Sequence, residues 1–455
     1  MDSPGRIDEE TWRGRILALY LFAALLLGGG GTPNPATEIA LQLLAAVAIV
    51  AWVFADRHSK VRVPTLAIVV SLIVLVLPLL QLIPLPLELW QAMPGRTRIA
   101  DALAINDAGN SWLAWTISAP RTWASFLAML PPVLLMLGVA TIKRETVPAL
   151  LSAIVAAALL GAMLGAAQLA GGPKAFRLYT ETHDEWLTGF FANRNAAVDL
   201  FLIAGVALAA LSRNAQRTIP KSVFWGGAAV LTFAALLTGS RAGIALIPAA
   251  CLAVWLILRT GQGRRPFKWR RVGLYGLGAA VVAILLALRA AGSNRIGSIA
   301  ERFARDDIGR AELWRDTCAA TLAHWPWGSG IGTFVPAFIP YERLEAVDPS
   351  FPNRAHGEWL EFLLEAGIFA PLIVVIIAAI LVHSARRVWQ IPAERPTVIL
   401  ASATLLLMTL HGLVDYAFRT MALSSLAGVA AGLLLRSVRD HHNGSETHDR
   451  MGKTG

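Results

Sequence analysis

Residues 63–84 read VPTLAIVVSLIVLVLPLLQLIP, a run of 22 residues without a charged side chain. A helix of about 20 apolar residues crosses the hydrocarbon core of a bilayer. Residues 371–382, PLIVVIIAAILV, have the same character, and neither run alternates between polar and apolar positions as a barrel strand would. Because a helix satisfies its backbone hydrogen bonds within its own segment, these runs predict membrane-spanning helices.

The composition of the whole chain agrees with these runs. The 455 residues are 56% hydrophobic and 15% charged, with a mean hydropathy of +0.57, whereas about a quarter of a soluble chain is charged. The two cysteines, Cys251 in an apolar run and Cys318 in a polar stretch, do not suggest a disulfide scaffold, and no long low-complexity tract indicates disorder. The sequence therefore predicts an all-α polytopic integral membrane protein.

Twelve segments have about the length of a membrane span. The first follows arginines as a signal anchor would, but no convincing cleavage site follows it, so it is kept as a span. Helices 1 to 9 would occupy residues 1–289, a large external loop with short helices residues 290–365, helices 10 to 12 residues 366–436, and a cytoplasmic tail residues 437–455. The predicted spans are residues 14–30, 36–55, 63–84, 122–141, 147–170, 195–212, 222–238, 241–258, 272–289, 366–385, 397–414 and 418–435.

The distribution of Lys and Arg predicts the orientation. With the N-terminus inside, 24 of the 40 basic residues lie on one side and 16 on the other, eight of these 16 in or next to the long loop. This asymmetry is the positive-inside pattern of a chain with both termini in the cytoplasm. The densest basic run, residues 264–271, is interpreted as a topology signal that contacts anionic membrane lipids rather than as a nucleic-acid site.

The external stretch 290–365 is long enough to indicate a functional part of the chain. Within it, residues 314–325 carry apolar side chains at intervals of three and four, which predict a short amphipathic helix that ends before Pro326 and is suited to the bilayer surface. Three glycines follow between residues 328 and 332. Their amides would either hold an anion or form a turn, and the turn is the commoner use.

The sequence lacks the usual signatures for nucleotides, nucleotide sugars, zinc proteolysis and serine hydrolysis. The remaining candidates for a functional site are ionisable residues at the outer ends of the spans, where burial of a charge is costly and a partner is expected. Arg241 stands in the sequence TGSRAG after Ser240, without another charge between residues 224 and 258. A guanidinium binds phosphate oxygens bidentately, and a diphosphate would suit this position; an arginine that snorkels to the interface is the alternative.

Two further segments place charge at the same side. Arg194 lies in FFANRN, flanked by amides that include Asn195, at the start of the sixth span. Asp415 and Arg419 lie in the short turn between the last two spans. A structural ion pair between them is favoured over a functional role.

A histidine at the edge of the tenth span is a candidate base. His356 stands in NRAHGEWLE, and an imidazole titrates near neutrality, so it can accept a proton from a sugar hydroxyl. The alternative is a loop histidine without a role. Glu358 and Glu361 would orient it or be solvated.

These segments resemble the O-antigen ligase and O-antigen polymerase family of bacterial envelope glycosyltransferases. That family commonly has His followed by Asn, Ser or Gln, then nine residues, Gly, two residues and a small residue. This chain has His356, Gly357, nine residues, Gly367 and Ala370, so Gly357 departs from the pattern. The other segments that carry the resemblance are Phe190–Asn195, Leu237–Gly243, Pro326–Phe334, Trp112–Thr122 and Asp415 with Arg419.

The resemblance implies a GT-C-like fold in the bacterial inner membrane, with its active site facing the periplasm and with metal-free chemistry that needs no cofactor. The donor would be an undecaprenyl diphosphate-linked glycan, with Arg194 and Arg241 binding the diphosphate. His356 would deprotonate the acceptor hydroxyl while Arg241 stabilises the leaving group, and the configuration would invert. Asn195, Ser240, Glu358, Asp415 and Arg419 would support the site.

The acceptor stays open. A ligase transfers the glycan to lipid A-core, a polymerase to a growing lipid-linked glycan, and some relatives to protein; the ligase is ranked first. A lipid or glycan transporter is the competing class. Against it, no internal repeat and no matched pair of Gly/Pro-broken helices is evident in the sequence.

Overall fold

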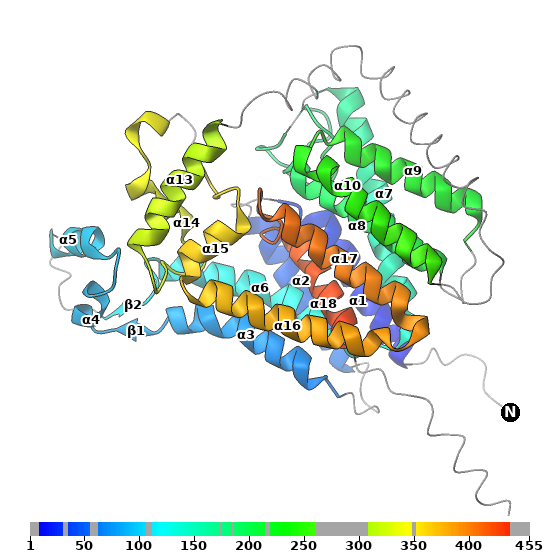
Figure 1. Ribbon diagram of the computed structural model, residues 1–455, viewed down its shortest axis with the longest axis horizontal. Coiled ribbons are helices and arrows are strands. Elements are labelled where there is room, and N and C mark those ends of the chain that lie inside the picture. The colour runs from blue at the N-terminus through cyan, green and yellow to red at the C-terminus, as the bar shows by residue number, and fades with distance from the viewer. Residues whose placement is uncertain are drawn as a thin grey trace, which may run out of the picture.

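The computed structural model describes residues 9–30, 35–54, 62–105, 112–172, 174–183, 185–213, 219–260, 308–347 and 352–436. Helices dominate these residues (Figure 1). The long helices are α1 Glu9–Leu27, α2 Pro35–Phe54, α3 Thr65–Gln81, α6 Ala119–Val139, α7 Val147–Gly171, α8 Arg194–Ser212, α9 Lys221–Leu237, α10 Arg241–Arg259, α13 Ile308–Ala323, α16 Phe369–Trp389, α17 Arg395–His411 and α18 Met421–Leu435. The short elements are β1 Pro84–Leu85, α4 Leu87–Gln91, α5 Thr97–Ile105, β2 Leu113–Ala114, η1 Arg144–Thr146, α14 Phe334–Phe338, η2 Ile339–Tyr341, η3 Leu344–Ala346, α15 Glu358–Ala366 and η4 Pro392–Glu394.

The predicted all-α polytopic membrane fold is confirmed. Within the described residues, seven helices are long and apolar enough to cross a membrane, and α3, α9 and α18 are shorter apolar helices. Each predicted span except one coincides with a described helix. The exception, residues 272–289, lies outside the described residues, as do the basic run 264–271 and the tail 437–455.

Gly367 determines where the helix of the tenth predicted span begins. The span expected to begin at residue 366 begins at Phe369, because Gly367 breaks the helical path with φ +56° and separates α15 from α16. A left-handed backbone of this kind favours glycine. The predicted helix around residues 314–325 is found as α13, which ends at Ala323.

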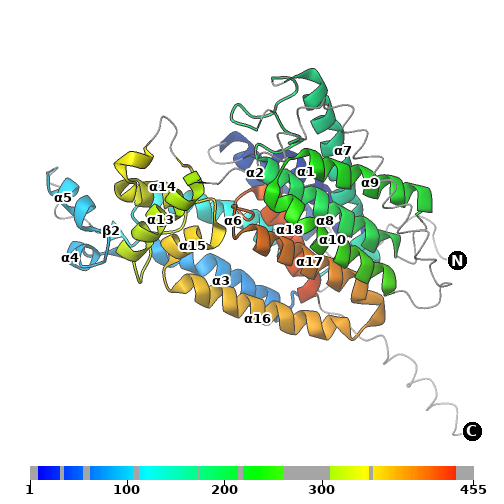
Figure 2. The ribbon, with the colours of Figure 1, turned by 45° about the horizontal axis from the view of Figure 1, so that its top comes forward.

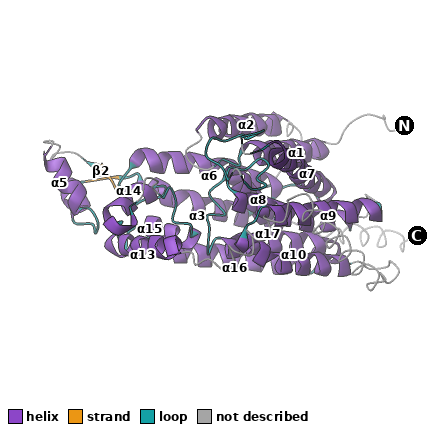
Figure 3. Ribbon diagram, turned by 90° about the horizontal axis from the view of Figure 1, so that it is seen from above, coloured by secondary structure: helices purple, strands orange, loops and turns teal. Residues whose placement is uncertain are grey.

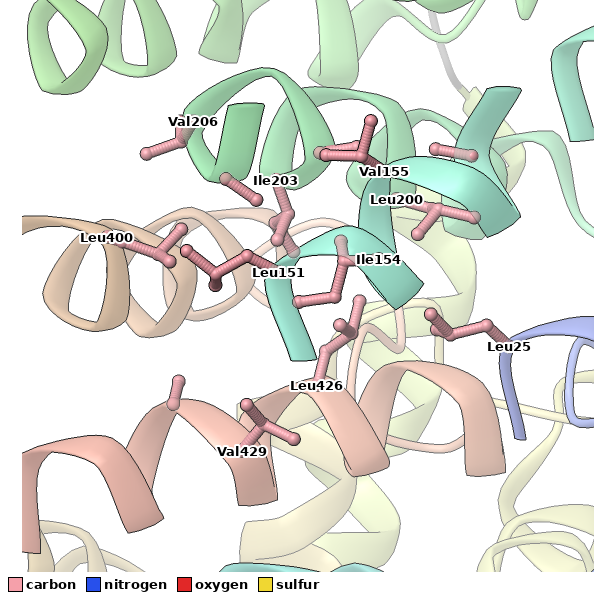
Figure 4. Packing of buried hydrophobic residues seen from close by; sticks show 14 of the residues in the cluster. Leu25, Leu151, Ile154, Val155, Leu200, Ile203, Val206, Leu400, Leu426 and Val429 are labelled. Carbon is pink, nitrogen blue, oxygen red and sulfur yellow. The ribbon is translucent and has the colours of Figure 1, made fainter. Parts of the chain in front are cut away.

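Helix α8 lies at the centre of the bundle. It packs against α7, α9, α10 and α17, and nearly all of its residues from Ala196 onward are buried. A helix that is apolar on all sides belongs in such a position. Figure 4 shows Leu200 and Ile203 of α8 among side chains of α7, including Leu151 and Ile154.

All the short elements except η1 and η4 gather at one end of the bundle, here called the α15 end (Figures 1 and 3). Two stretches far apart in the sequence meet there: the β1–β2 hairpin with α4 and α5, and the segment that carries α13 to α15. Arg96 joins them, because its Nη2 donates to the carbonyl of Trp115 at 2.6 Å and approaches that of Gly328 at 3.4 Å. The neighbouring Arg98 donates to the carbonyl of Pro340 at 2.6 Å.

The three glycines between residues 328 and 332 form a turn against the junction of α15 and α16. Gly328 donates its amide to His324, while Gly330 and Gly332 donate theirs to the backbone and side chain of Glu365, at distances of 2.9 to 3.0 Å. These amides are therefore engaged within the protein, and the turn interpretation is confirmed. Figure 2 shows α16 continuing from this junction alongside α3.

Gly367→Ala tests this junction. A Cβ at residue 367 would lie 2.0 Å from the carbonyl oxygen of Pro326, in a backbone conformation that L-residues rarely adopt. We expect the substitution to lower the free energy of unfolding by at least about 2 kcal/mol. Thermal unfolding of the purified protein in detergent measures this loss.

Gly309→Ala is the matched control, since a Cβ there meets nothing within 4 Å and the residue lies in helix α13. It should be neutral or stabilise the protein by about 0.5–1 kcal/mol. Equal melting temperatures for the two variants would show that the junction does not depend on glycine.

Candidate functional site

His356 lies at the α15 end, just before α15. Its backbone has φ +45°, which is uncommon for a residue other than glycine, and its side chain is 31% exposed. Nδ1 lies 3.3 Å from Oδ1 of Asp415, and the imidazole packs edge-on against Tyr416 at 5.2 Å between ring centroids. Trp314 fixes the segment, because its Nε1 donates to the carbonyls of Ala355 at 3.0 Å and His356 at 3.2 Å.

Asp415 is buried behind His356 in the turn between α17 and α18. Oδ1 accepts a hydrogen bond from the amide of Tyr416 at 2.9 Å, and Oδ2 accepts one from the side-chain amide of Asn195 at the start of α8. Burial raises the pKa of Asp415, but contact with His356 outweighs burial and lowers it to about 2. Asp415 is therefore a carboxylate at neutral pH, placed to fix the imidazole on its Nδ1 side.

The predicted ion pair between Asp415 and Arg419 is wrong. Arg419 instead pairs with Glu358 at 2.7 Å, Glu365 at 3.0 Å and Glu361 at 3.5 Å, all of them on α15. A spacing of four residues brings side chains together in a helix, but residues 412–420 form turns, so Asp415 and Arg419 face different neighbours.

Neither Glu358 nor Glu361 forms a hydrogen bond or ion pair with His356 among the described residues, and neither side chain lies in solvent. Both are buried, and Glu361 binds Arg354 at 2.8 Å and the amide of Ala355 at 2.9 Å. Burial raises the pKa of Glu361, but the charges of Arg419 and Arg354 outweigh it and lower the pKa overall. Burial and the neighbouring Glu361 raise the pKa of Glu365 to about 7 against the opposing charge of Arg419. This cluster of three carboxylates and two guanidinium groups ties the His356 segment to the turn that carries Asp415.

Arg194 and Arg241 are the first residues of α8 and α10, and these two helix starts lie together. Trp186 joins them, because its ring lies under the Arg194 guanidinium at 5.0 Å, while Gly239 approaches the same ring so closely that a Cβ would come within 2.0 Å. A Cβ at Gly243 in the first turn of α10 would likewise lie 2.4 Å from the Val198 side chain of α8. Two arginine residues and the positive ends of two helix dipoles therefore lie in one region, which suits an anion.

Two of the predicted supporting residues organise these helix starts. Ser240 caps α10 by accepting a hydrogen bond from the amide of Gly243 at 3.1 Å, so its oxygen is engaged with the protein backbone. Asn195 donates to Asp415 and thereby connects the start of α8 with the His356 contact. The side-chain amide that binds the Asp415 carboxylate therefore comes from α8.

His183 is a site residue that the sequence did not single out. It lies in the segment before α8, and its electrostatic interactions reach Arg194, Asp415 and His356. Burial and the positive charge of Arg194 lower the pKa of His183 to about 4, so this imidazole is neutral at physiological pH. A lone loop histidine without a motif carries no signal that could have found it. Among the described residues, no group of three or more His, Cys, Asp or Glu side chains is arranged to hold a metal ion.

Arg419→Gln tests the carboxylate cluster. The substitution leaves buried carboxylates of α15 without their shared cation, and we expect it to lower the free energy of unfolding by roughly 3–5 kcal/mol. Chemical or thermal unfolding in detergent measures the change. Arg386→Gln, at an exposed arginine in the last turn of α16, is the control and should stay within about 0.5 kcal/mol. Similar losses in the two variants would contradict a special role for Arg419.

Part of the chain is similar to a known family. Residues 226–375 match the family model described as O-antigen ligase. The matched span runs from α9 into the first turns of α16 and includes Arg241 and His356, whereas Arg194, Asp415 and Arg419 lie outside it. None of the curated proteins compared with the chain matches it.

Proposed function

Because the chain carries the O-antigen ligase domain over residues 226–375, we propose that it transfers a glycan from undecaprenyl diphosphate to an acceptor hydroxyl, with lipid A-core as the first candidate acceptor. The observation that carries the proposal is the His356–Asp415 contact beside the joined starts of α8 and α10. The domain supports glycosyl transfer of the ligase or polymerase type. The residues of the site support the roles assigned below.

His356 is the proposed general base. Oδ1 of Asp415 lies 3.3 Å from Nδ1; the two atoms are not in hydrogen-bond geometry, but the carboxylate charge favours the tautomer with its proton on that nitrogen and leaves the lone pair of Nε2 to take the acceptor proton. The exposed fraction of the imidazole allows an acceptor to reach it, while Asp415 behind it is 3% exposed. A positive φ at His356 is a strained conformation of the kind that clusters at functional sites.

Arg194 and Arg241 are the proposed diphosphate clamp. The acceptor oxygen forms a bond to the anomeric carbon as the bond between that carbon and the phosphate oxygen breaks. The electron pair leaves with undecaprenyl diphosphate, and His356 holds the proton. Two guanidinium groups and two helix starts stabilise the negative charge that develops on the leaving oxygen. Attack opposite the leaving group inverts the configuration.

The proposed orientation places the α15 end at the periplasmic face of the bacterial inner membrane. The excess of Lys and Arg on the opposite side supports both termini in the cytoplasm. Lipid-linked donor and membrane-bound acceptor would then reach His356 from the same bilayer surface. Holding both substrates beside one base supplies rate by proximity.

A lipopolysaccharide gel tests the function. A strain that lacks the gene is complemented with the wild type, His356→Ala, Arg241→Ala or the control His383→Ala, which replaces an exposed histidine within α16. We expect the deletion, His356→Ala and Arg241→Ala to lose every glycan-bearing band and accumulate lipid-linked polymer, while His383→Ala restores the ladder. A surviving single-repeat band would indicate a polymerase instead. An unchanged pattern would contradict both and favour a protein acceptor, another glycan or transport.

Asp415→Asn tests the assigned orientation of the base in a purified transfer assay. The amide keeps the size of the side chain but removes the charge that fixes the imidazole. We expect kcat to fall about 100-fold or more with KM little changed, as for loss of general-base catalysis. Because the pKa of Asp415 is about 2, the wild-type profile above pH 5 should not show its titration. Unchanged kcat in a correctly folded variant would refute the role of Asp415.

A further inference from the structure

A second histidine–aspartate pair lies beneath the first, inside the helical bundle. His411 at the end of α17 and Asp199 of α8 are each 1% exposed, and His411 Nδ1 lies 2.7 Å from Asp199 Oδ1. The remaining atoms of the pair, Asp199 Oδ2 and His411 Nε2, have no hydrogen-bond partner among the described residues. Two ionisable groups within spanning helices are costly to bury, and apolar side chains would pack there without that cost.

The pair repeats the contact at the proposed site one helical turn away. Asn195 and Asp199 are four residues apart on α8, and they contact Asp415 and His411, which are also four residues apart. The amide of Asp415 also donates to the carbonyl of His411 at 3.0 Å. The position of the Asp415 carboxylate is therefore fixed from below by the Asp199–His411 bond and from the side by Asn195.

The charges of the two pairs complement each other. His411 is the last residue of α17, where the negative end of the helix dipole stabilises a cation, and Asp199 adds to this stabilisation at hydrogen-bond distance. With His411 protonated, the charge of Asp199 would be balanced, and no second uncompensated carboxylate would lie near Asp415. Electrostatic interactions connect Asp415 with both members of the pair.

We propose that Asp199 and His411 form a charge-balanced pair that positions Asp415 against the proposed base His356. Because the two charges of the pair cancel, the net negative charge near His356 is that of Asp415 alone. This inference rests on the proposed function for its catalytic consequence. Its electrostatic part concerns the titration of His356 and can be measured without any substrate. Neither residue touches the reacting atoms in this scheme.

Other charged groups face this region from several elements. Arg310 of α13 interacts electrostatically with His411, and His183 interacts with His356 and Asp415. Arg194 begins α8, and Arg241 begins α10, which packs against α17. Further neighbours are Tyr416 beside Asp415 and the cluster formed by Arg354, Arg419, Glu358, Glu361 and Glu365. These groups remain unchanged in the variants below, so differences between variants report the pair.

The test follows the titration of His356 by NMR of ¹⁵N-histidine-labelled protein in nanodiscs, with the signal assigned through His356→Gln. His411→Asn keeps a donor toward Asp199 but removes the cation, so the midpoint should rise by about half to one pH unit. Asp199→Asn keeps an acceptor but removes the anion, so the midpoint should fall by a similar amount. Shifts in the same direction, or none in either variant, would overturn the charge-balanced pair.

The transfer assay distinguishes this inference from the proposed function. If wild type transfers glycan and His356→Ala does not, the function stands, and both pair variants should then lose about tenfold or more in kcat with little change in KM. Wild-type kcat in both variants would overturn the positioning role while leaving the function intact. Transfer by His356→Ala at the wild-type rate would instead refute the base assignment, and the NMR shifts would still decide the pair.

Ser384→Ala is the matched control, because Ser384 is a buried polar residue on the neighbouring span α16. It should change neither the His356 titration nor kcat. The double variant of Asp199→Asn and His411→Asn removes both charges and should return the midpoint toward the wild type. A double variant that shifts further than either single one would contradict charge balance.

Discussion

The pairing of Arg419 with α15 is the constraint on which the site depends. Arg419 follows the turn that carries Asp415, and its guanidinium is bound by carboxylates of Glu358, Glu361 and Glu365. Because α15 begins just after His356, this one cation fixes the histidine segment against Asp415. Arg354 extends the cluster to the other side of His356 by binding Glu361. Burying a charge without a partner is energetically costly, so removing one member of the cluster would destabilise the others.

A second constraint comes from α8, which supplies polar contacts from the centre of an apolar bundle. Its first turn brings Arg194 to Trp186 and Asn195 to Asp415, and its next turn brings Asp199 to His411. The rest of the helix is buried among apolar neighbours, which fixes its position. The site thus rests on a rigid element, and small displacements of its polar groups are opposed by the packing of the whole bundle.

The sequence predicts the spans well because a run of apolar residues has one physical solution in a bilayer. It also makes Arg194, Arg241 and His356 candidates for the site, since a charge or histidine at the end of such a run stands out. The sequence predicts less well which charged side chains pair with each other. The shared turn between the last two spans suggested that Asp415 and Arg419 pair, but the turn geometry and the position of α15 give each a different partner. Glu358 and Glu361 could not be assigned before the fold placed Arg419 beside them, and His183, Asp199 and His411 belong to no motif that marks them.

The arrangement separates the two tasks of the proposed reaction between two parts of the chain. The cations at the starts of α8 and α10 come from residues 194 and 241, whereas His356, Asp415 and the carboxylate cluster come from residues 354–419. Asn195 bridges these two parts, because it adjoins Arg194 in sequence and donates to Asp415 in space. A change in the position of α8 would therefore move the diphosphate clamp and the orienting carboxylate together. Because Arg194 and the contact to Asp415 both depend on this one buried helix, the proposed base and the leaving group keep a fixed relative position. An in-line displacement requires such a fixed geometry.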